Sequence, residues 1–225
     1  PTTPPLDLTG ANAADFDPSL APTASAHIVA FIDAHNGTQL CLATIGPDTL
    51  NPDCTHHPGF TLGHPVAWSP DGTAILVFGQ KTGNRSQFGL IEFNSNVPYS
   101  SHAADWGQGQ VVTPMTSPGQ GVIAGAFSPD GKQVALISNI GTFNFHVFLT
   151  ARNDLGMAHA STLPGQACQV AWRSDGRMLA IMRADSACSQ TTGDIYAIAL
   201  NDPGTDHNVA TQAANPAWQP VSTGG

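Results

Sequence analysis

The side chains best suited to chemistry in this sequence are histidines and aspartates. Three of the nine histidines, His56, His57 and His64, lie close together and could hold Zn²⁺ or a similar cation. However, adjacent residues on a strand point to opposite faces, and no accompanying ligand motif follows. The sequence therefore favours a polar loop over a metal site at these histidines, and it predicts neither a metal nor a cofactor.

Carboxylates offer a second kind of chemistry, because glycosidases use a pair of them in one cleft. Asp33, Asp105, Asp185 and Asp194 are available, but spacing in the sequence does not tell which of them lie together in a ring. The chain contains no Gly-x-Ser-x-Gly, Walker, EF-hand or dinucleotide-binding motif. We therefore expect a protein without catalytic residues, with a hydrolase or lyase that uses acids and histidines at a channel mouth as the alternative.

Composition excludes several classes of protein. The 225 residues suffice for one β-sandwich, barrel or propeller domain. The formal net charge of −9 argues against binding to nucleic acid or anionic lipid, both of which require a basic surface. The apolar runs are too short to cross a membrane, and hydrophobic residues at 41% exclude a wholly disordered chain.

The four cysteines form two pairs that are close in sequence, which predicts the disulfides Cys41–Cys54 and Cys168–Cys188. The alternative is four buried free thiols. No Cys-x-x-Cys occurs, which argues against a zinc site of the usual spacing. Disulfides and scarce charge together predict an extracytoplasmic protein.

Prolines concentrate at the N-terminus. Residues 1–26 contain five of them among Ala, Thr and Asp, and this composition predicts a linker. A linker connects to something, so we expect an anchor upstream that tethers the chain to a cell envelope. The expected domains are a linker over 1–26, a folded domain over 27–220 and a tail over 221–225.

The folded domain contains an internal repeat. An apolar strand ends in an aromatic residue, a Ser-Pro-Asp-Gly turn follows, and a second apolar strand leaves the turn. The aromatic positions, spaced by 59, 45 and 46 residues, are Trp68, Phe127, Trp172 and a degraded copy at Trp218. The residues that form the turns are Asp71, Gly72, Asp130, Gly131, Asp175 and Gly176. Each unit continues with a third strand, over 39–44, 88–93, 146–150 and 195–200, and a weaker fourth strand.

Four antiparallel strands per repeat predict an all-β propeller. The hairpin resembles the WD40-like PD40 repeat of TolB-type β-propellers over essentially residues 27–220. The third copy departs from the motif at Arg173 and Ser174, and the fourth lacks Asp-Gly. The resemblance implies protein–protein interaction or sensing at the bacterial envelope, although one fold hosts many functions.

The number of blades depends on how the ring closes. The first unit lacks an inner strand, and residues 215–219 form an inner strand without a blade of their own. We therefore expect four blades, with the C-terminal strand paired to the N-terminal blade, which would remove exposed edges. The alternatives are five blades, with extra strands from 1–26, and an open fragment of a larger ring.

The longest repeat contains an insertion over 94–110, with Tyr99, His102 and Trp106. Such a loop could bind a ligand, but the sequence favours packing of Trp106 on the edge of the blade.

One face of a propeller collects the loops from second to third strands and the connections between blades. We call this the loop face and expect any ligand or protein partner there; a structural spacer with contacts on its sides is a further alternative. We expect a monomer. The predicted binding residues are Asp33, His35, Asn36, His56, His57, Lys81, Asn84, Arg85, Asn144 and Asp185, with Asn139 and Gln190 on the same loops.

Overall fold

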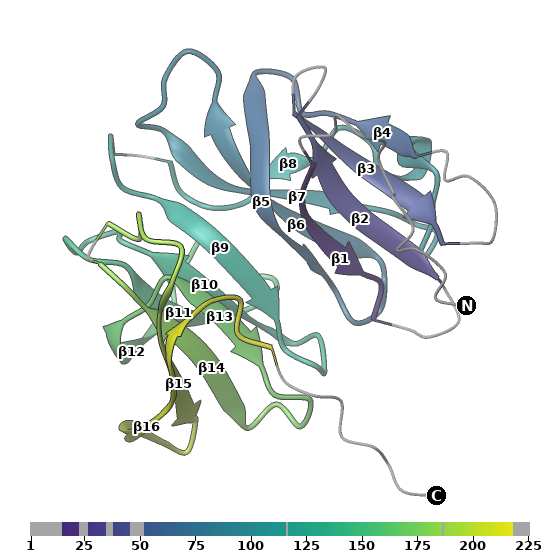
Figure 1. The fold of residues 1–225 in the computed structure, drawn as a ribbon. Coiled ribbons are helices and arrows are strands. Elements are labelled where there is room, and N and C mark those ends of the chain that lie inside the picture. Colours follow the sequence, from purple (N-terminus) through teal and green to yellow (C-terminus); the bar gives the residue numbers. More distant parts are fainter. Residues whose placement is uncertain are drawn as a thin grey trace, which may run out of the picture.

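The structure is a computed structural model that describes residues 15–22, 27–34, 38–45, 52–115, 117–185 and 187–217. These residues form four antiparallel sheets of four strands each, arranged around a central cavity (Figure 1). In every sheet the strands follow one another in sequence order, with the first strand beside the cavity. The predicted all-β, four-bladed propeller is confirmed.

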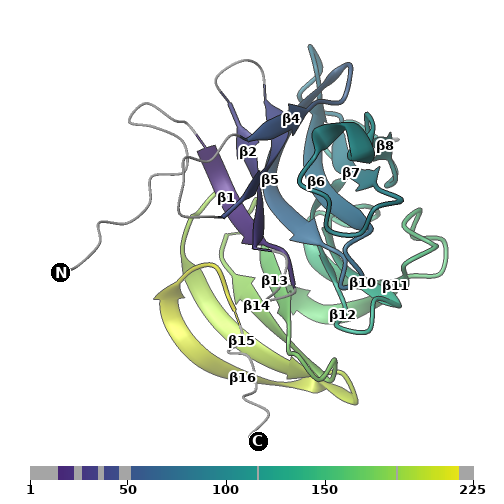
Figure 2. The ribbon, with the colours of Figure 1, turned by 90° about the vertical axis from the view of Figure 1, so that its right-hand side faces the viewer.

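Each blade is built from one continuous stretch of chain. Blade one contains β1 (Asp15–Leu20), β2 (Ile28–Asp33), β3 (Gln39–Thr44) and β4 (Asp53–Thr55). Blade two contains β5 (Phe60–Trp68), β6 (Ala74–Lys81), β7 (Phe88–Asn94), the 3₁₀ helix η1 (Ala103–Trp106) and β8 (Gln110–Val111). Blade three contains β9 (Val122–Phe127), β10 (Gln133–Ser138), β11 (His146–Ala151) and β12 (Ser161–Gln166). Blade four contains β13 (Gln169–Trp172), β14 (Met178–Arg183), β15 (Gly193–Ala199) and β16 (Asp202–Ala213), the long outer strand that curves along the lower edge in Figure 2.

The repeated turn holds the first two strands of a blade together. In blade two, Asp71 Oδ1 accepts hydrogen bonds from Ser69 Oγ at 2.6 Å and from the Thr73 amide at 3.1 Å. Gly72 has a φ of +69°, which glycine adopts without steric cost. Blade three repeats this arrangement at Asp130. In blade four, Arg173 replaces the serine and donates from Nε to Asp175 at 2.9 Å.

The aromatic residue of each repeat fastens its blade to the preceding one. Trp68 donates its indole N–H to the Ser19 carbonyl in β1 at 3.0 Å, and Trp172 donates to the Ala126 carbonyl in β9 at 2.8 Å. Phe127 has no such donor, and it is buried in an apolar cluster with residues of β6 and β7. The repeated aromatic residue therefore makes contacts between blades.

Apolar clusters join blades one and two, two and three, and three and four. Among the described residues, no such cluster joins blade four to blade one. Leu20, which holds the aromatic position in β1, is 64% exposed, whereas Trp68 and Phe127 are each 7% exposed. In the described part of the chain, the contact between the last and first blades therefore lacks the packing of the other three.

The strand that completes blade one differs from the expectation. The expected partner was the C-terminal segment 215–219, but residues 15–20, assigned to the linker, form β1 and pair with β2. The sheet tolerates a proline here because Pro18 lies within a register irregularity between Phe16 and Ser19. The segment Leu20-Ala21-Pro22 also matches Trp68-Ser69-Pro70 of the repeat, 48 residues further on.

The C-terminal segment instead returns to the inner strand of its own blade. Asn215 donates its amide to Gln169 Oε1 at 2.6 Å, and Gln169 Nε2 donates to Asn215 Oδ1 at 3.2 Å. Asn215, Pro216 and Ala217 line the central cavity there. Trp218 lies outside the described residues. Residues 15–20 complete a four-stranded blade rather than supply a fifth one.

The insertion in blade two packs against blade one, as the sequence favoured. Trp106 is 1% exposed, donates its indole N–H to the Ser100 carbonyl at 3.0 Å and meets Trp68 edge to face at 5.4 Å. The Ala103 amide donates to Asp53 of β4 at 2.9 Å. This loop therefore strengthens the contact between blades one and two.

Both predicted disulfides are present. Cys41–Cys54 joins directly opposed residues of β3 and β4, and Cys168–Cys188 ties the β14–β15 loop to the residue before β13. No helix among the described residues is long and apolar enough to cross a membrane.

Candidate functional site

The central cavity is a candidate site with a volume of about 1600 Å³. The inner strands β1, β5, β9 and β13 form its wall, together with the β14–β15 loop and residues 215–217. None of the described side chains that line it is acidic or basic, and none is a histidine. The wall consists of Ala, Gly, Pro, Val, Ile, Phe, Trp and Met with a few Ser, Thr, Asn and Gln residues.

The wall also offers main-chain hydrogen bonds. Each inner strand is the first strand of its sheet and pairs within the sheet on one edge only. The other edge lies along the cavity, where the carbonyls of Ser19 and Ala126 already accept the indole N–H groups of Trp68 and Trp172. An extended polypeptide can bind such an edge through its own main chain.

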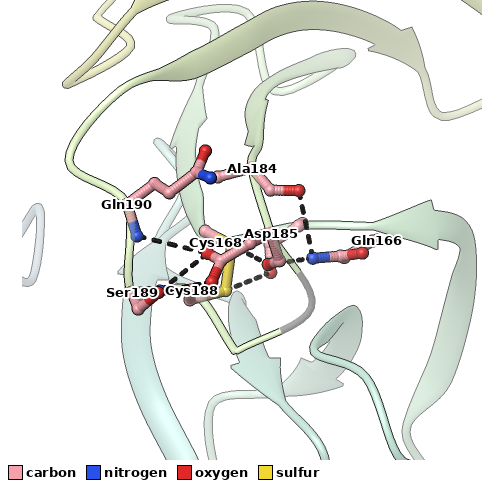
Figure 3. Close-up of a disulfide and its surroundings, with 8 residues drawn as sticks. Gln166, Cys168, Ala184, Asp185, Cys188, Ser189 and Gln190 are labelled. Carbon is pink, nitrogen blue, oxygen red and sulfur yellow. Dashed lines mark hydrogen bonds between the residues drawn. A yellow bond between two sulfur atoms is a disulfide. The ribbon is translucent and has the colours of Figure 1, made fainter.

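The Cys168–Cys188 disulfide shapes the rim of the cavity (Figure 3). Asp185 accepts hydrogen bonds from the amides of Ser189 at 2.8 Å and Gln190 at 3.2 Å, and from the Ser189 hydroxyl. The Ser189 hydroxyl is the main reason that the pKa of Asp185 lies below its usual value. Because both of its oxygens accept hydrogen bonds within the loop, Asp185 helps to hold the shape of the rim.

A second, smaller hollow of about 480 Å³ lies on the loop face between blades two and three. We call it the mouth cleft. It adjoins the central cavity, because Phe78, Ile123 and Ala187 line both. Its remaining lining residues are Gln80, Arg85, Phe88, Gly119, Asn139, Phe143 and Phe145.

The structure brings only part of the predicted binding set to these hollows. Of that set, Arg85 lines the mouth cleft, and Asp185 anchors the cavity rim. Asn84 lies in the turn before Arg85, where its Oδ1 accepts hydrogen bonds from Ser86. Lys81 and Asn144 are exposed on the same face, and neither lines a hollow. His35 and Asn36 lie outside the described residues.

The histidines do not converge on a common point in the described structure. His57 Nδ1 lies 2.9 Å from the Pro58 carbonyl, and its ring meets Phe60 edge-on, while His56 is exposed. The side chain of His64 lies outside the part of the chain that the structure describes. A separate group of three potential metal ligands, Asp33, Cys41 and Cys54, cannot offer thiolates because its cysteines form a disulfide.

Sequence reasoning missed the aromatic residues of the mouth cleft. Phe78 and Phe88 belong to apolar strands and Phe145 directly precedes one, so a core position is the ordinary expectation for all three. Phe143 carried a usable signal, because it follows Gly141 and Thr142 in a polar loop. It is fully exposed in the structure.

Comparisons with known proteins identify the fold. No protein-family model matches the chain, and no curated protein matches it. Solved structures do match, including TolB from Acinetobacter baumannii, with a TM-score of 0.64 at 15% identity over 91% of this chain and 45% of that chain. A TolB candidate from Agrobacterium tumefaciens gives a TM-score of 0.56 at 14% identity over 81% of this chain and 60% of that one. A puromycin hydrolase gives a TM-score of 0.57 at 12% identity over 91% of this chain and 32% of that one. The chain thus spans less than two thirds of each of these proteins, and it has the fold of the TolB β-propellers.

Proposed function

We propose that this chain is a non-catalytic, extracytoplasmic binding module that holds a segment of a partner protein in its central cavity and on the surrounding loop face. The observation that carries the proposal is the uncharged wall of the cavity, formed by apolar and amide side chains of the inner strands and of the loops beside them. Such a wall suits an uncharged stretch of an extended polypeptide. It offers no general acid or base among the described side chains.

Two further features support the proposal. The disulfides suit an oxidising compartment, such as the exterior of a cell or a bacterial periplasm. The repeat resembles the PD40 motif, and the TolB-like fold fits the role in protein interaction or sensing at the envelope that this resemblance implies. The predicted loop-face residues, among them Arg85 and Lys81, would surround the bound segment.

A photo-crosslinking amino acid at Gln190 tests the proposal, because Gln190 is exposed and lines the cavity rim. The matched control carries the same group at Gln133, which is exposed at the start of β10 on the opposite face. We expect illumination of cells that make the protein to give a protein adduct of one defined mass from Gln190 and none from Gln133. Equal labelling at both positions, or none at Gln190, would contradict the proposal.

A further inference from the structure

We propose that the mouth cleft selects the bound segment by taking an aromatic side chain of the partner next to a carboxylate. This inference rests on the proposed function, because it specifies which polypeptide the loop face binds. It arises from two features of the cleft: a wall of phenylalanine side chains, and a cation that has no carboxylate partner in the part of the chain that the structure describes.

The wall of the cleft is aromatic. Phe78 and Phe88 lie with their ring centroids 6.1 Å apart, and Phe145 is 7% exposed in the adjoining cluster between blades three and four. Phe143 stands at the tip of the β10–β11 loop and is fully exposed. A ring inserted among these side chains would bury apolar area on both partners and make edge or stacked contacts.

The cation is Arg85. All seven basic side chains lie in the described part of the chain, and most of them face a carboxylate. Arg152, Arg173 and Arg183 form ion pairs at Asp71, Asp175 and Asp206. Lys132 and Arg177 lie within electrostatic reach of Asp130 and Asp175. Arg85 and Lys81, both exposed beside the β6–β7 turn, have no carboxylate partner among the described residues.

The position of Arg85 is fixed by its main chain. Gln80 Nε2 donates to the Arg85 carbonyl at 2.8 Å, which holds the turn against β6. The guanidinium can therefore offer a forked pair of donors to a carboxylate at the edge of the aromatic wall. Because the whole chain is acidic, this local cation would decide which acidic segments approach, within a screening length of about 8 Å at physiological salt.

The neutral polar groups of the cleft argue for a peptide rather than a sugar. Asn139 accepts a hydrogen bond from the Gly121 amide and donates one to the Gly119 carbonyl, both at 2.9 Å. Gln80 Nε2 donates one of its two N–H groups to the Arg85 carbonyl. The phenylalanine rings bear no hydroxyl or N–H group. Of the neutral side chains of the cleft, Asn139 and Gln80 can thus give the hydroxyl groups of a sugar at most one further N–H each, whereas an apolar ring and one carboxylate need only the wall and Arg85.

Four capped synthetic peptides test the inference. They share a Gly/Ser frame and differ at two adjacent positions, which read Glu-Phe, Lys-Phe, Glu-Ala or Lys-Ala. Dissociation constants come from NMR titration of the whole chain, which also maps the amides that shift. We expect the Glu-Phe peptide to bind about tenfold more tightly than either the Lys-Phe or the Glu-Ala peptide, with shifts in the β6–β7 and β10–β11 loops.

Matched variants identify the residues responsible. Arg85→Glu should reverse the preference for Glu over Lys, whereas Lys132→Glu makes the same change of net charge on the opposite face and should leave it intact. Phe143→Ser should remove the advantage of Phe over Ala, and Val97→Ser, at another exposed apolar residue, should not.

Two results would overturn the inference: the same charge preference in Arg85→Glu as in the unaltered protein, or binding of acidic oligosaccharides in place of all four peptides. If the peptides show no such preference but Gln190 still gives a specific adduct, only the proposed selectivity of the mouth cleft is refuted. Loss of the Gln190 adduct would instead refute the proposed function.

Discussion

Asp71 should stabilise this propeller more than its counterpart in the next repeat, because it also holds two blades together. Beyond the bonds within its turn, Asp71 Oδ2 accepts a hydrogen bond from Arg152 Nη1 of blade three at 2.7 Å. Arg152 Nη2 also donates to Thr73 Oγ1 at 3.1 Å, and its guanidinium lies 5.4 Å from the centre of the Phe127 ring. Burial would raise the pKa of Asp71, but the hydrogen bonds from Ser69, Arg152 and Thr73 outweigh it and hold the pKa well below its usual value.

Asp130 is the matched control. It accepts hydrogen bonds from Ser128 Oγ at 2.7 Å and from the Lys132 amide at 3.1 Å, as Asp71 does within its own turn, but no arginine reaches it from another blade. Both variants lose these two bonds, but Asp71→Ala also loses the bond that Asp71 Oδ1 accepts from Thr73 Oγ1 at 2.8 Å, because Lys132 stands at the position of Thr73 in the other turn. The difference between the two variants therefore contains this bond as well as the contact with Arg152, and the cycle with Arg152→Ala separates the two.

The expected difference is modest. The Asp71 side chain is 52% exposed and the Arg152 side chain 27%, so solvent screens much of their attraction. We expect Asp71→Ala to lower the free energy of unfolding by about 1 kcal/mol more than Asp130→Ala does. For a chain of this size, that corresponds to a further fall in Tm of roughly 2–4 °C.

Thermal unfolding of both variants, of Arg152→Ala and of the double variant Asp71→Ala/Arg152→Ala provides the measurement. The double-variant cycle should give a coupling energy of about 1 kcal/mol between the two side chains. Equal Tm values for Asp71→Ala and Asp130→Ala, with no coupling in the cycle, would refute the reasoning.

Three further predictions concern stability. Gly72→Ala should lower Tm more than Gly131→Ala, because both glycines have positive φ but only at Gly72 would a Cβ overlap the ring of Tyr99; equal losses would count against this. Replacing Cys168 and Cys188 by serine should cost about 3 kcal/mol of unfolding free energy and loosen the cavity rim, as denaturant unfolding and hydrogen exchange of the rim amides would show. Acid should destabilise the protein, because the turn aspartates have pKa values below that of an unfolded aspartate, about 3.9, and one lies at about 2. Their contribution is complete above about pH 4 and is lost as the pH falls toward 2, so a Tm that is constant over this range would contradict the assignment.

The local structure of this protein could be predicted from its sequence, because neighbouring residues determine it. Asp71 and Gly72 fix a turn through bonds and dihedral angles that span a few residues, so the hairpins and the count of four blades followed from the repeat. The disulfides followed for the same reason, since each joins cysteines in neighbouring strands or in an adjoining loop.

The sequence did not predict the inner strand of blade one, because the repeat motif is degenerate there. Leucine replaces the aromatic residue at position 20, and prolines made the segment resemble a linker. What makes it a strand is long-range: it pairs with β2, it accommodates Pro18 at a register irregularity, and Ser19 accepts the indole N–H of Trp68.

The candidate site depended still more on tertiary structure. The sequence predicted that Arg85 and Asp185 lie on the loop face, because the order of the strands alone determines on which face each loop lies. It could not show that Asp185 is engaged within its own loop, nor that Phe78, Phe88 and Phe143 from two blades share one cleft with Arg85. Those facts depend on the distance and the angle between blades. Packing of side chains where the blades meet sets both, and no local sequence pattern encodes them.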